Sequence, residues 1–146
     1  MTSPAVVALK CTTALDRIDR GEILYYLDGK LSRDGTPVET VAVVTAEAVT
    51  IYKGHGDEEI SVPITVLGKT EVLMKRRDKD GAVTQVFAGD AANAGDKLYY
   101  SSAGTTTVTI KKTKADSAWK LLGIAVHSIS TRTSSVDVIV NFAASA

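Results

Sequence analysis

Two histidines, one cysteine and scattered carboxylates are the residues of this chain that could do chemistry. His55 lies beside Asp57, Glu58 and Glu59, and an acid–base or metal site would require such groups to converge in space. One histidine next to carboxylates in a Gly-rich stretch is more typical of a solvated, charged loop. His127 lies in an apolar segment, where we expect its side chain at a strand face or a subunit contact rather than on a ligand.

Cys11 is the lone cysteine, so no disulfide can form within the chain, and a reducing compartment is the simpler setting. A reactive thiol would need a neighbouring base, and no histidine lies near it in sequence. We therefore expect Cys11 to be a small apolar filler of the core. Because no His-x-His, Glu-x-x-His or Cys-x-x-Cys pattern occurs, the sequence predicts no metal site, no cofactor and no catalytic residue.

Asp90 and Asp96 each follow a glycine, and a calcium loop would be one use for them. They lack the alternating ligand order and the closing glutamate of such a loop, whereas Asp beside Gly is ordinary in tight turns. Lys75-Arg76-Arg77 is a run of three consecutive basic residues. It could dock on an acidic partner, but a solvated hairpin tip is the favoured interpretation. Trp119 is expected to be a packing anchor rather than a ligand platform.

Charge and hydropathy exclude several partners. Seventeen basic and seventeen acidic residues give a formal net charge of +0. Binding to nucleic acid or to an anionic membrane usually requires a basic face, so we expect neither partner. The apolar runs are shorter than the roughly 18 residues of a membrane-spanning helix, and the N-terminus shows no signal-peptide pattern. With no net charge to keep copies apart, self-association is tolerable.

The elements that would position these residues are predicted to be strands. Val and Thr each occur 17 times, and both favour sheets. Apolar residues alternate over 59–67, again from Val72 to Met74, and over 136–142. Turn signals such as Asp28-Gly29 separate these runs. Residues 118–129 also fit a helical stripe, but Gly123 and the β-branched neighbours favour a strand.

This spacing predicts about nine to eleven short strands in an all-β fold, a small barrel or sandwich of short antiparallel strands. Residues 1–20 fit the pattern poorly, so we interpret them as an N-terminal arm and residues 21–146 as a single β domain. Thr13 could cap a helical turn that ends at Gly21. The apolar run Ala5, Val6, Val7, Ala8 and Leu9 either enters the core or reaches a neighbouring molecule; these five are our predicted contact residues.

The C-terminal stretch 88–142 carries a resemblance. Its two Gly-Asp turns at 89–96 lead into Lys97-Leu98-Tyr99, and Leu122-Gly123-Ile124-Ala125-Val126 and Val136-Asp137-Val138-Ile139-Val140 follow. This order resembles head decoration proteins, also called cement proteins, of tailed bacteriophages. The resemblance covers a little over a third of the chain.

That resemblance implies a structural, non-enzymatic protein of the virion, made in the host cytoplasm. It would sit on the outer capsid surface and bridge subunits of the major capsid protein, as a homotrimer. A flexible or lattice-contacting N-terminal arm is similar to what such proteins use. The alternatives are a phage tail or fibre component, or another surface β module that binds a carbohydrate or a protein, and a small enzyme whose site is assembled in space.

Overall fold

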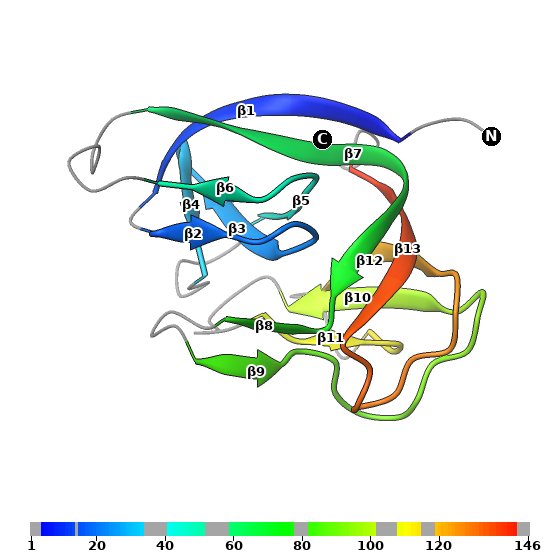
Figure 1. The fold of residues 1–146 in the computed structure, drawn as a ribbon. Helices are drawn as coiled ribbons and strands as arrows, with labels where there is room; N and C mark the ends of the chain where they lie inside the picture. Colours follow the sequence, from blue (N-terminus) through cyan, green and yellow to red (C-terminus); the bar gives the residue numbers. More distant parts are fainter. Residues whose placement is uncertain are drawn as a thin grey trace.

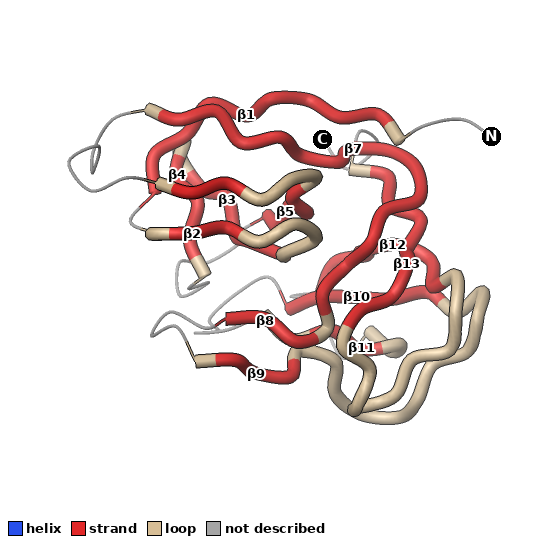
Figure 2. The backbone as a smooth tube through the Cα atoms, in the orientation of Figure 1, coloured by secondary structure: helices blue, strands red, loops and turns tan. Residues whose placement is uncertain are grey.

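The structure, a computed structural model, describes residues 4–13, 15–33, 41–51, 59–77, 82–101, 108–114 and 119–142. This described part consists of strands and loops without a helix (Figure 2), which confirms the all-β prediction. The first strands are β1 (Ala5–Thr13), β2 (Arg17–Ile18), β3 (Ile23–Leu27), β4 (Lys30–Ser32), β5 (Val41–Thr45) and β6 (Val49–Thr50). The others are β7 (Ile60–Leu73), β8 (Lys75–Arg77), β9 (Val83–Gln85), β10 (Lys97–Ser101), β11 (Ile110–Lys111), β12 (Trp119–Ala125) and β13 (Ser135–Asn141).

Five strands close into a barrel. They follow the order β1-β4-β3-β5-β7, and β1 pairs with β7 to complete the circle. All of these pairings are antiparallel except that of β1 with β4, which is parallel at Thr12 and Thr13. The chain leaves β1 through β2 before it enters the β3–β4 hairpin, so β1 and β4 are not hairpin neighbours and can run in the same direction. The barrel is therefore mixed rather than purely antiparallel.

Two apolar cores share the wall formed by β3 and β5. The side chains of the barrel core are those of Cys11, Ile18, Leu24, Leu31, Val43, Val62 and Ile64. Successive residues of a strand point to opposite faces, so Ile23 and Tyr25 instead join a second core. That core also takes side chains from β10, β12 and β13. Because β3 is buried on both faces, its sequence is a continuous run of apolar and aromatic residues.

A single long strand links the two halves of the molecule. β7 pairs with β1 over its first part and with β13 from Leu67 to Leu73 (Figure 1). The sequence predicted one strand over 59–67 and the start of another at Val72, and this division is wrong. Lys69, between these two segments, is an exposed residue of one strand that continues, because β13 supplies its backbone partners there.

The helical turn predicted between Thr13 and Gly21 is also wrong. The described residues there form a loop and the short strand β2, which pairs with β6. Gly21 has a φ of +78°, and a Cβ on it would lie 2.6 Å from the carbonyl oxygen of Glu71. It is thus a turn residue pressed against β7 and not a helix stop: its carbonyl accepts a hydrogen bond of 2.8 Å from the Leu73 amide.

Two local predictions are confirmed. Asp28-Gly29 connects β3 to β4, with φ values of 51° and 76°, as an Asp-Gly hairpin turn requires. The ambiguous segment after Trp119 is the strand β12 and not a helix. Its neighbours are β10 on one side and, at Gly123 to Ala125, β13 on the other.

Candidate binding surfaces

The predicted contact residues Ala5 to Leu9 lie in β1. Strand β1 pairs with β7 from Ala5 opposite Leu67 to Cys11 opposite Ile60, and with β4 only at Thr12 and Thr13. Before Thr12, therefore, no strand in the described part of the chain pairs with the second edge of β1. The described residues of the predicted arm therefore do not stand apart, because β1 is a barrel strand held by backbone pairing and β2 pairs with β6.

This edge of β1 is apolar and accessible. Val6 is 49% exposed and Val7 is 48% exposed, and Leu67 on the adjoining part of β7 is 46% exposed. Exposed, apolar edge strands present backbone N–H and C=O groups that can pair with another chain, and folded proteins usually cover them. Because successive residues of a strand point to opposite faces, Val6 and Val7 flank the unpaired edge of β1 on its two sides, and Leu67 lies across the pairing with β7. We call this segment of β1, with Val6, Val7 and the neighbouring Leu67, the β1 edge; its composition suits contact with another protein.

A second apolar surface lies on the outer face of β12 and β13. Ile124 and Ile139 are paired directly across the two strands, and they are 40% and 46% exposed. Leu121, further along β12, is 50% exposed. We call these three side chains the β12–β13 patch. Contiguous exposed apolar residues of this kind mark interaction sites more often than isolated ones do.

A pocket of about 310 Å³ lies beside the β1 edge. Val6 contributes to its lining, and its charged lining residues are Arg20, Lys69, Glu71 and Asp137. Two cations and two anions cancel, so the pocket favours no ligand of one charge sign.

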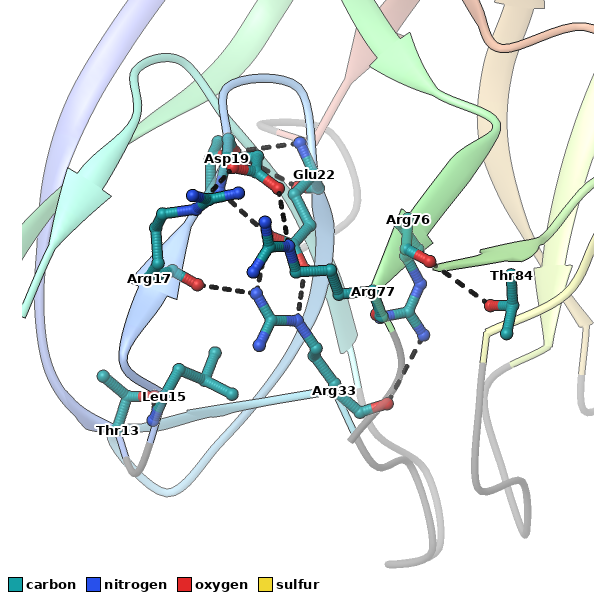
Figure 3. A network of polar contacts seen from close by, with 10 residues as sticks. Thr13, Leu15, Arg17, Asp19, Glu22, Arg33, Arg76, Arg77 and Thr84 are labelled. Atoms are coloured by element: carbon teal, nitrogen blue, oxygen red, sulfur yellow. Dashed lines mark hydrogen bonds and ion pairs between the residues drawn. The ribbon is translucent and has the colours of Figure 1, made fainter. Parts of the chain in front are cut away.

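The basic cluster Lys75-Arg76-Arg77 forms β8 and is not a solvated tip. Arg76 is 2% exposed, because the middle residue of this short strand faces inward. Its guanidinium donates hydrogen bonds to the carbonyl oxygens of Arg33 and Arg77, at 3.4 and 3.0 Å (Figure 3). Arg76 therefore connects the β8–β9 hairpin to the barrel, and its buried side chain is not presented for docking to an acidic partner.

Arg76 belongs to a larger polar network around a buried ion pair. Glu22 is fully buried, and its carboxylate accepts hydrogen bonds from both Nε and Nη2 of Arg33 (Figure 3). Asp19 lies at the more exposed side and pairs with Arg17 at 3.2 Å and with Arg77 at 3.6 Å. The sequence pattern did not reveal this network, since Glu22 stands at the head of an apolar strand. The Glu22 carboxylate and the Arg33 guanidinium are bonded to each other and to backbone groups of Asp19 and Arg17, which indicates a structural role.

The other candidate groups do not converge. His127 follows β12 and lies 3.6 Å from the carboxylate of Asp137, with a side chain that is 66% exposed. His55 lies outside the described residues. The thiol of Cys11 is buried in the barrel core, and its pKa is raised by this burial and, to a lesser degree, by the negative charge of Glu59. The position of Cys11 agrees with the expected filler role.

The Gly-Asp motif forms a turn. The carboxylate of Asp96 accepts a hydrogen bond of 2.8 Å from the amide of Asn93, which is ordinary turn chemistry. In the part of the chain that the structure describes, no three His, Cys, Asp or Glu side chains are grouped so as to hold a metal ion. No helix in that part is long and apolar enough to cross a membrane.

Comparisons of the chain with protein-family models, with curated proteins and with solved structures find no match.

Proposed function

We propose that this chain is a structural protein that decorates the outside of a tailed-bacteriophage capsid and bridges neighbouring major capsid subunits. The observation that carries the proposal is the β1 edge, where exposed apolar side chains stand on an edge strand that is part of a closed barrel. The order of motifs over 88–142 supplies the phage context, through its resemblance to head decoration proteins.

A decoration protein acts by shape and not by catalysis. It needs a rigid body and a surface complementary to a repeating lattice. Because β1 closes the barrel, the β1 edge is presented on a fixed framework and loses little conformational entropy on binding. A typical specific interface buries about 800 Å² on each partner. When several copies are joined, weak individual contacts add through effective concentration.

We assign the contact between copies to the β12–β13 patch and propose a homotrimer. Ile124 and Ile139 lie on a paired sheet face, and the β1 edge remains available for the capsid. Analytical ultracentrifugation should give three times the chain mass. Ile124→Lys with Ile139→Lys should give a folded monomer, because two lysines would enter the contact. Val83→Lys, on a residue that is 69% exposed on β9, is the matched control and should remain trimeric.

Capsid binding tests the main proposal. The purified chain is mixed with empty capsids assembled from the major capsid protein of the phage whose genome carries the gene, and co-sedimentation is measured. We expect saturable binding, weakened about tenfold or more by Val6→Lys, since burying a lysine in an apolar contact is costly. Val83→Lys should bind as the natural chain does.

Deletion of β1 is a poor test, because it would open the barrel as well as remove the contact. Val6→Lys changes an exposed side chain and leaves the backbone pairing in place; circular dichroism should therefore match that of the natural chain. If the folded natural chain does not sediment with capsids, the proposed function is wrong. If Val6→Lys binds unchanged, the β1 edge is not the contact.

A further inference from the structure

A second pocket lies where β10 and β12 approach the start of β5. Its volume is about 310 Å³, and its lining includes Tyr99, Lys114, Trp119, Lys120 and Leu121. Small-molecule sites in proteins begin at about this size, near 300 Å³. The pocket shares no residue with the β1 edge. It shares Leu121 with the β12–β13 patch, whose paired residues Ile124 and Ile139 lie outside the pocket lining.

The strands fix the aromatic side chains of this pocket. Tyr99 is paired with Lys111 of β11 on one side and with Leu121 of β12 on the other. Trp119 stands at the start of β12, opposite Ser101. The Lys111 ammonium lies 5.4 Å from the centroid of the indole ring, a cation–π contact that helps to hold the ring in place.

Trp119 does not have the packing role expected from the sequence. It is partly exposed and, among the residues that the structure describes, is grouped with neither apolar core, whereas Tyr100, its neighbour in the pocket, is 3% exposed. A large aromatic ring kept partly in solvent at the wall of a pocket offers an apolar face to a ligand. Tyr99, also partly exposed, adds a second such ring from the adjacent strand.

The charges of this pocket have one sign. Lys114 and Lys120 line it, and Lys111 lies against its tryptophan, while none of its described lining residues is acidic. The chain as a whole has a net charge of zero, so this local excess is not a reflection of composition. The pocket beside the β1 edge, with two cations and two anions, provides the contrast.

We propose that this pocket binds an acidic sugar unit, a pyranose that carries a carboxylate. The C–H groups of a sugar ring pack on the negative face of an aromatic ring, and Trp119 and Tyr99 supply such faces. The ammonium groups of Lys114 and Lys120 attract the carboxylate. An acidic peptide would share the lysines, but the pocket is compact and at the lower end of ligand-site size, which favours one ring-shaped unit over an extended chain.

This inference goes beyond capsid decoration and does not depend on it. A protein displayed in many copies could hold acidic polysaccharide through many weak contacts of this kind. The site would remain if the chain had a different structural role, because all of its described residues lie on one chain.

Tryptophan fluorescence provides the test, since Trp119 is the single tryptophan of the chain. The full chain is titrated with glucuronic acid, with glucose as the neutral counterpart and with a short glutamate peptide. We expect a saturable change in emission with glucuronic acid, little with glucose, and weakening of the effect by added salt. Equal responses to the acidic and the neutral sugar, no response to any sugar, or a response to the peptide alone would overturn the proposal.

Substitutions locate the site. Lys114→Gln with Lys120→Gln should weaken glucuronic acid binding about 5- to 30-fold, from up to about fivefold for each exposed ionic contact. Lys120→Arg should retain most of the binding. Lys97→Gln removes the same charge from β10 outside the pocket and should have no effect. Trp119→Leu, followed by amide chemical shifts in nuclear magnetic resonance spectra, should lose binding while the rest of the spectrum shows a folded chain. Unchanged affinity in the double lysine variant would place the ligand elsewhere.

Discussion

Removal of the Glu22 carboxylate should cost far more stability than removal of the Asp19 carboxylate, although both belong to one network (Figure 3). Glu22 is fully buried and its ion-pair partner Arg33 is 6% exposed. The Glu22 carboxylate also accepts a hydrogen bond of 3.0 Å from the amide of Asp19. The side chain of Asp19 is 32% exposed, and its partner Arg17 is 49% exposed.

The expected magnitudes follow from burial. Glu22→Ala leaves the Arg33 guanidinium buried without its carboxylate, although it can still donate to the Arg17 carbonyl oxygen at 2.6 Å. Breaking one side of a buried ion pair costs about 3–5 kcal/mol. Asp19→Ala breaks two pairs in contact with water, each worth about 0–1 kcal/mol. Because domains of this kind are stable by about 5–15 kcal/mol, the first variant should lose a large share of its stability and the second a small one.

Urea denaturation followed by far-ultraviolet circular dichroism measures both variants against the natural chain. The slope with urea should stay constant while the midpoint falls, as it does when stability alone changes. A further variant, Glu22→Leu with Arg33→Met, removes both charges and should be more stable than Glu22→Ala, since no buried charge remains unpaired. The reasoning would be refuted if Glu22→Ala lost less than about 1 kcal/mol of stability. It would also be refuted if Asp19→Ala lost as much stability as Glu22→Ala.

Three further predictions concern the strands. Gly123→Ala should lower the free energy of unfolding by about 1–3 kcal/mol in the same assay, because the new Cβ would lie 2.2 Å from the Ile139 carbonyl oxygen and 2.9 Å from a methyl of Val138; an unchanged midpoint would contradict this. Burial raises the pKa of the Tyr100 phenol in the folded chain. The protonated phenol therefore stabilises the fold fully below the ordinary pKa of about 10, and this stabilisation is lost as the pH rises through the raised pKa of the folded chain. Tyr100→Phe should accordingly lose less stability than the natural chain between about pH 9 and pH 11, and equal losses would argue against this assignment. Cys11, whose pKa is also raised by burial, should react slowly with iodoacetamide in the folded chain and faster in urea; rapid labelling without urea would show an accessible thiol.

Local chemistry accounts for the predictions that the structure confirms. The Asp28-Gly29 turn follows from the positive φ that both residues adopt readily. The alternation of Val136, Val138 and Val140 places these side chains in the core, where they are at most 5% exposed. The β-branched residues and Gly123 correctly favoured a strand in β12. These turn and alternation patterns involve only residues that are close together in the sequence, so they can be recognised without the tertiary structure.

The partners of the strands were not predictable in the same way. A period of two says which side chains share a face, but not which strand lies alongside. The parallel pairing of Thr12 with Lys30 and the continuity of β7 through Lys69 depend on backbone groups distant in sequence. Burial of Arg76 is a similar case, because its hydrogen bond to the Arg33 carbonyl exists only after the barrel and the β8–β9 hairpin have come together.

The same division applies to the proposed sites. The apolar character of Ala5 to Leu9 was evident from sequence, yet only the fold makes this segment a barrel strand with an accessible edge. Trp119 was interpreted from the sequence as a packing residue, and Lys111, Lys114 and Lys120 were assigned no role. The pairing of β10 with β11 and β12 collects them at one pocket. The sequence by itself determined which residues are apolar, charged or suited to turns; tertiary pairing decided which of them meet, because contacts between strands join residues that the chain keeps far apart.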